Sequence, residues 1–389
     1  MAWDSILAKD FCKSVRDGTH DTPKQMEMGY KLVTSKCIHD GFIFPEEAYF
    51  ISEKDYRAIN ERSLVEQWDV LMSMIGNGLG RSAVVKQKPD YAIKNLALFK
   101  VGDEYKAKWL HYYLSSPVGQ GLIYNSLQGS GQPFISLNLL RNFAIPNPPY
   151  EAIKKIVSVL ELYDNLIENN QKQIKLLEEA AQRLYKQWFI DLRYPGHETT
   201  KIVDGLPEGW HYGSITEIST CYDSKRKPLS SKERDQQEKV YPYYGAASLM
   251  DYVEKFIFDG VYLLFGEDGT VITSDETPML QYVWGKFWVN NHAHIFQGAN
   301  GYSTEFLYML CKHMKIKDIV TGVAQPKISQ GRLNDKKIVI PSRTMVAKYS
   351  ELTLAIFKQI RLLNDVVNAS KEARDRLLPK LMNNEIEVG

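Results

Sequence analysis

One regular pattern between residues 151 and 191 constrains the fold of this 389-residue chain more than any other feature. Its members are separated by alternating gaps of three and four residues, and all but Asn170 are apolar or aromatic: Ile153, Ile156, Leu160, Tyr163, Ile167, Asn170, Ile174, Leu177, Ala181, Leu184 and Trp188. A heptad pattern of this length predicts a helix roughly 60 Å long that packs lengthwise on another helix. Asn170 would fix the register of that pair at some cost in stability. The buried face of an ordinary helical bundle is the alternative interpretation of the same pattern.

A second heptad pattern lies near the C-terminus and has the same order of gaps: Val346, Tyr349, Thr353, Ile356, Ile360, Leu363 and Val367. It weakens after Val367, where Ser370 and Arg374 occupy the positions expected to be apolar. Pro379 predicts that this helix ends near Leu378. The two helices are predicted to pair with each other in antiparallel orientation, with both patterns buried.

Comparison of the chain with itself extends this repeat to the globular parts. Gln132-Pro133-Phe134-Ile135-Ser136 returns as Gln325-Pro326-Lys327-Ile328-Ser329, and Ile145-Pro146 returns as Ile340-Pro341 just before the second heptad pattern. Internal similarity at this scale indicates two copies of one module. We therefore predict four parts: a first globular domain at 1–146, a first long helix at 147–196, a second globular domain at 197–341 and a second long helix at 342–389.

Each globular domain shows a mixture of short strands and short helices. Apolar runs at 70–75 and 261–265 that end in Gly predict strands, and a further strand is predicted at 93–101. Helices are predicted at 108–114 and 304–313. Because strands and helices do not alternate strictly, the predicted class is α+β: two similar globular domains separated by two long antiparallel helices that form a coiled coil with pseudo-twofold symmetry.

Composition limits the functions that this chain can have. With 48 Lys and Arg against 47 Asp and Glu, the net charge is +1, so any DNA-binding surface must come from local clustering of charge. The four cysteines form no Cys-x-x-Cys pair, which predicts reduced thiols and neither a zinc site nor a disulfide framework. No apolar run approaches the ~18 residues that span a bilayer, and the first residues do not resemble a signal peptide. We expect a soluble, cytoplasmic protein that does not contact a membrane.

Several stretches, spread over nearly the whole chain, resemble a known family. They are Asp17-Gly18-Thr19-His20-Asp21-Thr22-Pro23-Lys24, Glu168-Asn169-Asn170-Gln171, the run from Glu178-Glu179 to Tyr194-Pro195-Gly196-His197, Leu206-Pro207-Glu208-Gly209-Trp210, Tyr241-Pro242-Tyr243-Tyr244-Gly245-Ala246, Val289-Asn290-Asn291-His292-Ala293-His294 and Thr321-Gly322-Val323-Ala324-Gln325-Pro326-Lys327. Each is a weak signal alone, but in this order over two repeats they resemble the specificity (S) subunit of type I restriction-modification systems. The second helix is less regular than the first, and Ile340-Pro341 lacks the Pro-rich sequence that precedes the first helix.

The resemblance implies a DNA reader that catalyses no reaction. Each target-recognition domain would contact one half of a split, asymmetric target in double-stranded DNA, and the helices would set the spacing and dock two methyltransferase subunits. The chain itself would hold no cofactor. S-adenosylmethionine would be bound by the methyltransferase subunits, while the restriction subunits would use ATP and Mg.

Candidate DNA contacts are polar or basic side chains in predicted loops, because such groups bind base edges and phosphates. They are Thr19, His20, Lys24 and Arg81 in the first half, and Lys225, Arg226, Lys227, Lys232, Gln325 and Lys327 in the second. The basic cluster lies in a highly charged segment, 224–239, for which a mobile, solvated loop is the alternative. The Gln-Pro segments could equally be turns that precede the helices, and the Gly-rich run before Arg81 is predicted to be a tight turn. His292 and His294 are interpreted as packing or polar-face residues because the sequence shows no further metal ligands near them.

Three other functions fit parts of the sequence. Asn147-Pro148-Pro149-Tyr150 matches the catalytic signature of amino-methyltransferases, so a single-chain DNA adenine methyltransferase is the main alternative. It lies directly before a heptad pattern, however, and not in a parallel-sheet domain. Pro89-Asp90 with Glu104-Tyr105-Lys106 resembles a nuclease core, but it is predicted to lie in a polar loop and has no counterpart in the second half. A coiled-coil scaffold that binds only protein would explain the helices but not the two elaborate modules.

Overall fold

The structure is a computed structural model that describes residues 3–76, 78–129, 133–322, 324–386 and 388. The chain forms two compact units, one of Met1–Glu168 with Val367–Gly389 and one of Asn169–Val366. Helix α6 extends over Tyr150–Tyr185 and α10 over Arg343–Met382, so both helices contribute to both units. Each unit therefore combines one globular part, which we call the first or second module, with portions of both long helices.

The first module is built from small sheets. Its main sheet has the strand order β2-β10-β7-β8 and is antiparallel, whereas a second sheet, β6-β3-β9, contains one parallel pair, β3 with β9. Two further pairs are β1-β11 and β4-β5. The strands are β1 (Ser5–Leu7), β2 (Ser14–Asp17), β3 (Tyr30–Val33), β4 (Ile38–His39), β5 (Phe42–Ile43), β6 (Tyr49–Ile51), β7 (Val70–Ser73), β8 (Ser82–Val84), β9 (Tyr91–Ile93), β10 (Leu96–Lys100) and β11 (Ala144–Pro146).

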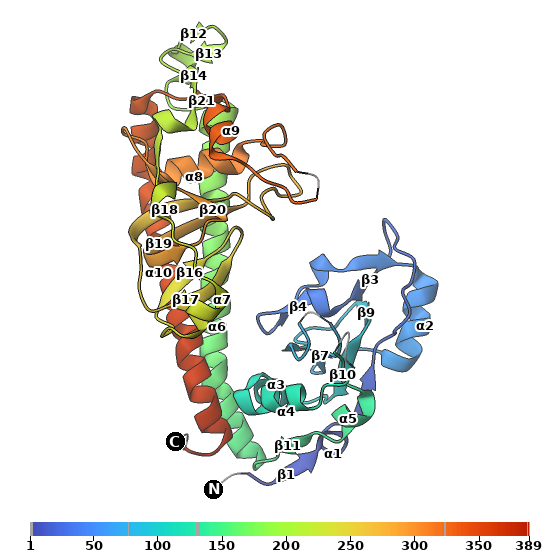
Figure 1. Cartoon of the computed structure of the whole chain (residues 1–389). Helices are drawn as coiled ribbons and strands as arrows, with labels where there is room; N and C mark the ends of the chain where they lie inside the picture. The colour runs from blue at the N-terminus through green and yellow to red at the C-terminus, as the bar shows by residue number, and fades with distance from the viewer. Residues whose placement is uncertain (1–2, 77, 130–132, 323, 387, 389) are drawn as a thin grey trace. The chain divides into compact units, whose positions relative to one another are not determined.

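Helices of the first module connect its main sheet to the long helices. They are α1 (Ala8–Phe11), α2 (Glu53–Ser63), α3 (Glu104–Ser115), α4 (Pro117–Asn125) and α5 (Leu137–Arg141). Figure 1 shows α3 and α4 between the main sheet and the first part of α6. Trp109 of α3 is fully buried there, and its indole N–H donates to the Pro146 carbonyl at 2.8 Å. The predicted helix 108–114 is thus confirmed.

The second module is organised around one six-stranded sheet. Its order is β15-β20-β18-β19-β16-β17, antiparallel except for β16 with β19. The strands are β12 (Ile202–Val203), β13 (Leu206–Pro207), β14 (His211–Gly213), β15 (Ser219–Cys221), β16 (Tyr241–Tyr244), β17 (Leu249–Val253), β18 (Phe258–Gly266), β19 (Leu280–Val289), β20 (Ala293–Gly298) and β21 (Ile338–Ile340). The helices are α7 (Ser231–Asp235), α8 (Thr304–His313) and α9 (Gln330–Asp335). The predicted strand 261–265 and helix 304–313 are confirmed, and the class is α+β.

The two long helices pack antiparallel, as the heptad patterns predicted. In the first unit, Ile153 and Leu160 near the start of α6 share a core with Leu378 near the end of α10. In the second unit the relation is reversed, because Ala181 near the end of α6 accepts a hydrogen bond from Tyr349 near the start of α10. All the predicted positions of both patterns are buried or half-buried: Ile153, Ile156, Leu160, Tyr163, Ile167, Asn170, Ile174, Leu177, Ala181 and Leu184 in α6, Trp188 just after it, and Val346, Tyr349, Thr353, Ile356, Ile360, Leu363 and Val367 in α10.

Asn170 is buried in the helix pair, as expected from its heptad position. Its side chain is 5% exposed, and among the described residues its Nδ2 has no hydrogen-bond partner. An unpaired amide of this kind costs free energy in an apolar seam, which fits a residue retained for register and not for stability.

Two expectations about local structure were wrong. Helix α10 does not end near Leu378 but continues through Pro379 to Met382, because a proline in the last turn removes only one helical hydrogen bond while Leu381 is buried. The expected strand 93–101 is two strands, β9 and β10, separated at Asn95, whose φ of 55° turns the chain. The apolar pattern of the sequence does not mark the break between β9 and β10.

Charged side chains join each module to the helices of its own unit, and the signs of the paired charges are reversed between the two units. In the first unit, Lys108 of α3 pairs with Glu161 of α6 at 2.6 Å, and Asp164 accepts from both Tyr112 and Arg374 at 2.5 and 2.8 Å. In the second unit the helix is basic and the module acidic. There Arg361 of α10 pairs with Glu305 of α8 at 2.9 Å. Within the described residues, no helix is long and apolar enough to cross a membrane.

Candidate nucleic-acid interface

Three segments of the second module meet at one end of its six-stranded sheet. Residues 223–228 follow β15, residues 267–269 follow β18, and the described residues of the segment 321–327, which is closed by a bridge between Thr321 and Lys327, form a hairpin that leads to α9. Because β15 and β18 are both antiparallel to β20, their C-terminal ends lie beside the start of β20. We call these three segments the loop cluster of the second module.

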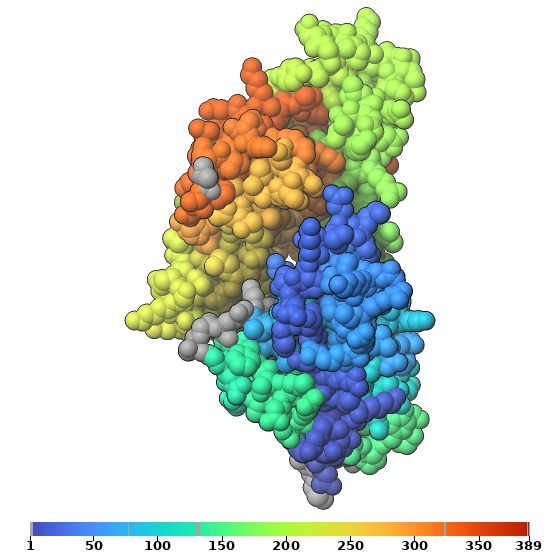
Figure 2. Space-filling model, turned by 90° about the vertical axis from the view of Figure 1, so that its right-hand side faces the viewer, coloured from blue at the N-terminus to red at the C-terminus, as the bar shows by residue number. Residues whose placement is uncertain are grey.

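Backbone hydrogen bonds hold the hairpin in place. Thr321 and Lys327 exchange two of them, at 2.8 and 2.7 Å, which closes the hairpin. The Ile328 amide donates to the Glu267 carbonyl at 2.9 Å, and the Gly269 amide donates to the Pro326 carbonyl at 3.0 Å. On the surface of the second unit, the corresponding gold and orange segments lie side by side (Figure 2).

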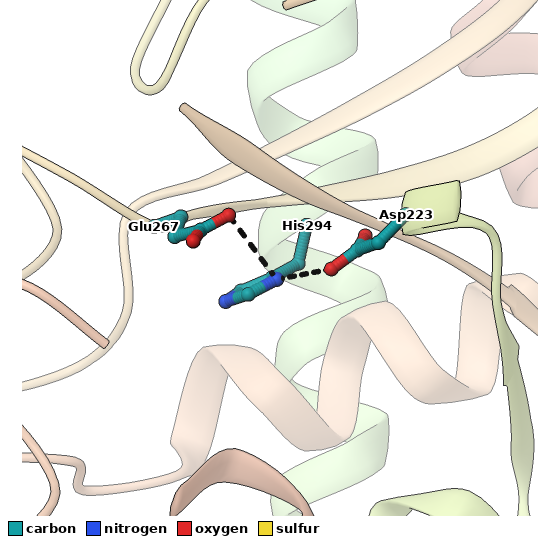
Figure 3. A group of neighbouring side chains, drawn as sticks. All are labelled: Asp223, Glu267 and His294. Carbon is teal, nitrogen blue, oxygen red and sulfur yellow. Dashed lines mark hydrogen bonds and ion pairs between the residues drawn. The ribbon is translucent and has the colours of Figure 1, made fainter. Parts of the chain in front are cut away.

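A buried polar network lies beneath the loop cluster (Figure 3). His294 of β20 is 1% exposed, and its Nδ1 lies 2.5 Å from Asp223 Oδ2 and 3.6 Å from Glu267 Oε2. Its Nε2 lies 2.9 Å from the carbonyl oxygen of Ile328 in the hairpin. Arg226 completes the network, because its guanidinium contacts Glu267 at 2.5 Å and Asp223 at 3.4 Å.

The geometry gives His294 a proton on both ring nitrogens. Nε2 faces a carbonyl oxygen and Nδ1 faces two carboxylates, so each nitrogen must donate to avoid placing its lone pair against an acceptor. Burial alone would raise the pKa of the Asp223 carboxyl, but hydrogen bonding to His294 and the Ile295 amide, together with the charges of His294 and Arg226, lowers that pKa below its usual value. Two carboxylates then balance one imidazolium and one guanidinium.

The sequence interpretation of His294 was therefore wrong in one respect. Asp223 and Glu267, residue types that can join histidine in a metal site, do lie beside it, brought there from distant parts of the chain. A metal would need a lone pair on Nδ1, whereas the contacts described above call for a proton at that atom. The described residues thus fit a charge-balanced hydrogen-bond network better than a metal centre.

Arg226 is held differently from its neighbours in the basic run. It was expected to bind phosphate, but its guanidinium is turned inward and donates to Glu267 and to the carbonyl oxygens of Asn291 and Ala293. Its side chain is only 15% exposed. A run of basic residues in the sequence does not reveal which of them meets an acidic partner from another strand.

The other predicted contacts of the second module are exposed. Lys225 lies over the ring of Tyr222 at 4.9 Å, Lys227 accepts a hydrogen bond from Trp288 through its backbone carbonyl only, and Lys232 lies on α7. In the hairpin, Lys327 is half-exposed at 3.6 Å from Glu267, and Gln325 donates to Asp268 at 2.8 Å. Segment 224–239 is not simply a loop, because it contains α7. Arg234 of that helix pairs with Asp251 at 3.0 Å.

The first module has a loop cluster of the same construction. Gln128 and Phe134 exchange two backbone hydrogen bonds, and the Ile135 amide donates to the Met74 carbonyl at 3.0 Å, as Ile328 does to Glu267. Asp17 ends β2 opposite Ala97 of β10. Asp17 therefore corresponds to Asp223, and Ala97 to His294.

This correspondence unites two groups of predicted DNA contacts. In both modules an aspartate at the strand end pairs with a basic side chain three residues later, His20 at 2.9 Å from Asp17 and Arg226 at 3.4 Å from Asp223. The loop that carries Thr19, His20 and Lys24 is thus the first module's version of the loop at 225–227. In the sequence, each loop carries a basic residue three positions after an Asp. The internal repeat seen in the sequence does not pair these two segments, so the correspondence becomes visible only in the structure.

The loop of the first module borders a surface cleft of about 390 Å³. It is lined by Thr19, His20, Asp21 and Pro23 together with residues of α2, among them Arg62. Figure 2 shows the chain after β2 and helix α2 side by side on this face of the first unit. His20 is exposed and is held between Asp17 and Asn95, while Lys24 is exposed beyond it.

Arg81 is exposed and follows a tight turn, as predicted. Gly76, Gly78 and Gly80 all have positive φ, between 78° and 95°, which glycine adopts without strain. Asn77 in this turn and Gln132, the counterpart of Gln325, lie outside the described residues.

Both tentative catalytic motifs have structural roles. Pro149 caps the start of α6, since its carbonyl accepts from the Ala152 and Ile153 amides, and the Tyr150 hydroxyl donates to Asp103 at 2.9 Å. Glu104 lies in helix α3 and not in a polar loop as expected, where it pairs with Lys108 at 2.5 Å.

Comparison with known proteins agrees with this architecture. The family model described as the type I restriction modification DNA specificity domain matches residues 4–179 and 207–345, which together form most of the chain and include both modules. The chain is 25% identical over 305 residues to the type I restriction enzyme MjaIX specificity subunit of Methanocaldococcus jannaschii, covering 72% of this chain and 69% of the relative. It is 22% identical over 405 residues to the putative MjaX specificity subunit of the same organism, covering 98% and 92%.

A solved structure shows the same fold. The S subunit of a type I restriction-modification system from M. genitalium superimposes with a TM-score of 0.58 at 16% sequence identity, over 98% of this chain and 96% of that chain. On the strength of the family match to both modules, the chain belongs to the type I restriction-modification DNA specificity family, as a specificity subunit, the non-catalytic component of such complexes.

Proposed function

We propose that this chain reads a bipartite, asymmetric DNA target, with each module recognising one half. The observation that carries the proposal is the pair of loop clusters, which share one backbone construction but present different side chains. Where the first module offers His20 and Lys24, the second offers Lys225 and Lys227, and where the second has Lys327 the first has Phe134. Two readers of one design with unlike contact residues would recognise two different short sequences.

The long helices would set the distance between the two half-sites. Each helix is continuous over both units, and its partner is buried against it along the heptad pattern. A continuous paired helix resists bending more than a loop does, so the gap between the half-sites would be fixed by helix length. The domain boundaries predicted from the sequence remain part of this proposal.

Two methyltransferase subunits would dock on the outer faces of these helices. Both helices expose leucines away from the buried pattern, Leu162, Leu166 and Leu176 on α6, with Leu352, Leu354 and Leu362 on α10. Counted from the buried positions, all of these except Leu354 fall at the same two heptad positions in both helices. Similar apolar stripes on two related helices suit two copies of one partner.

The remaining activities would reside in partner subunits. S-adenosylmethionine would be held by the methyltransferase subunits, and ATP with Mg by the restriction subunits, with the cytoplasm as the predicted compartment. The methyltransferase interpretation of Asn147-Pro148-Pro149-Tyr150 is set aside, because this segment starts α6 and the family is non-catalytic. A scaffold that binds only protein is set aside because the matched family model is that of a DNA specificity domain.

Mapping of methylated bases in cells that carry the intact system tests the proposal. We expect one asymmetric target with two specific parts separated by a gap of constant length and nonspecific sequence. Exchange of this chain for one with a different second module should change one part of the target and leave the other unchanged. A continuous target, or a change in both parts, would contradict the division of labour between the modules.

Lys225 and Lys227 are predicted to bind phosphate groups of the DNA. Replacing both with Ala should reduce the slope of log Kd against log salt by roughly two, because each lost phosphate contact releases about one counterion fewer. Titrations of target DNA at several salt concentrations measure this slope. Lys358, which is exposed on α10, is the matched control, and its replacement with Ala should leave the slope unchanged. An unaltered slope in the double variant would mean that the loop at 225–227 does not contact phosphate groups.

A further inference from the structure

The buried network of the second module joins the three segments of its loop cluster through one side chain. Asp223 comes from the first segment, Glu267 from the second, and the carbonyl of Ile328 ends the hairpin. His294 is in contact with all three. Several hydrogen bonds fix the hairpin. Among the described residues, the bond from His294 Nε2 to the Ile328 carbonyl is the one that a buried ionisable side chain donates.

The first module has no ionisable side chain in the equivalent place. Ala97 stands where the second module has His294, and Met74 stands where it has Glu267, and both are buried and apolar. Its hairpin is tied to the strand end by Phe134, which forms a β-bridge with Ile75. The two modules thus fix the same hairpin by different means, one apolar and one charged.

Charge balance makes the network depend on the His294 proton. The groups that face the ring are Asp223 and Glu267 with negative charge and Arg226 with positive charge, while Lys327 approaches Glu267 from the hairpin at 3.6 Å. Loss of the proton would leave the buried set with a net negative charge beneath a surface that must meet phosphates. A negative charge at that position opposes DNA binding.

We propose that His294, protonated on both nitrogens, is a positioning residue that holds the Gln325–Lys327 hairpin of the second module in its DNA-reading position. This inference rests on the proposed function. It adds that recognition of the second half-site, and of that half-site alone, depends on the proton of His294.

The sign of the pH effect follows from the geometry. On deprotonation, the remaining proton stays on Nδ1, because a lone pair against the Asp223 carboxylate would be more unfavourable than one against a neutral carbonyl. The bond to Ile328 is therefore the one that is lost, and the hairpin is then held to the strand ends by its backbone bonds to Glu267 and Gly269 without the support of His294. Discrimination at the second half-site should accordingly weaken as pH rises.

The experiment uses the full chain with its modification subunits and three duplexes: the mapped target, and two versions with one base pair changed in either half-site. The quantity measured is the ratio of Kd for changed and unchanged DNA. In wild type, the ratio for the second half-site should fall as pH rises. His294→Gln, which keeps one donor, should lower that ratio about tenfold at the acid end and remove its pH dependence, because one charge-assisted bond is lost.

Matched variants separate positioning from general damage. His292→Gln alters an exposed histidine two residues away, which lies 3.5 Å from Asp268, and should leave the second ratio and its pH profile as in wild type. In His294→Gln the ratio for the first half-site should equal that of wild type at every pH. Glu267→Gln offers a second measurement should His294→Gln fail to fold. It removes the carboxylate that lies beside His294, Arg226 and Lys327, and should likewise lower the second ratio while leaving the first ratio at its wild-type value.

The outcomes distinguish this inference from the proposed function. If both half-sites are discriminated but the second ratio is independent of pH in wild type, His294 does not position the hairpin. The same holds if the pH profile persists in His294→Gln. If the chain shows no bipartite target at all, the proposed function itself fails.

Discussion

Removal of one heptad from each long helix should bring the two half-sites of the DNA target about three base pairs closer. Deleting residues 169–175 from α6 and 366–372 from α10 shortens both helices by about 10 Å and keeps the buried pattern in phase, because a heptad contains whole repeats of that pattern. About three base-pair steps of B-DNA span this length. The gap is measured by selecting bound sequences from a pool of duplexes, or by methylation mapping.

Affinity should fall even at the new optimal gap. Removing three base pairs rotates one half-site by about 100° relative to the other, whereas a lost heptad rotates a helix by only about 20°. DNA twisting would have to absorb the difference. Deletion of the heptad from α6 alone is the control, because it places the helices out of step and should destabilise the protein without defining a new gap. A preferred gap that stays unchanged after the paired deletion would refute the role of the helices as a spacer.

Replacement of Arg374 with Ala should destabilise the first unit by about 3 kcal/mol. Arg374 donates to Asp164 at 2.8 Å, and Asp164 also accepts from the Tyr112 hydroxyl at 2.5 Å. Burial, followed by the charge of Asp164, raises the pKa of Tyr112, so this hydroxyl stays protonated as a donor. Without Arg374, the Asp164 carboxylate remains mostly buried with no cation bound to it, which is the costly outcome for a broken ion pair.

Arg376 provides a control on the same helix. It pairs with Glu372 at 2.6 Å, but both side chains are more than half exposed, so Arg376→Ala should cost well under 1 kcal/mol. Urea unfolding of both variants, followed with a probe in the first unit, measures the difference. Equal stabilities for the two variants would mean that the Asp164 site does not anchor the first module to its helices.

The two ion pairs that attach the modules to the long helices have reversed charges, and this affects which module can pack on which part of the helices. The first module meets acidic side chains on α6 through Lys108, whereas the second meets Arg361 on α10 through Glu305. A module placed on the wrong portion of the helices would bring like charges together, which is a common way to prevent incorrect pairing. Although the two modules share a design, each is therefore matched to its own site.

Sequence periodicity predicted the helices well because helix packing requires apolar residues at a regular spacing within a short stretch of sequence. Ile153, Leu160 and Ile167 are buried for the reason that their spacing indicates, since a helix pair must bury one face along its whole length. The repeat likewise identified the two modules, because the Gln-Pro hairpins and the Ile-Pro helix starts keep the same order in both halves. These features rest on neighbours that are close in sequence.

Tertiary structure alone brings the residues of the buried polar network together. Asp223, Glu267 and His294 lie far apart in the chain, and only the antiparallel pairing of β15 and β18 with β20 places their polar atoms within 4.8 Å of one another. The same pairing turned Arg226 inward while its neighbours Lys225 and Lys227 stayed exposed. The spacing of residue types along the sequence indicates which side chains share a face of a helix or strand. Which charged side chains pair with one another depends on strand register and burial, and these cannot be read from the sequence.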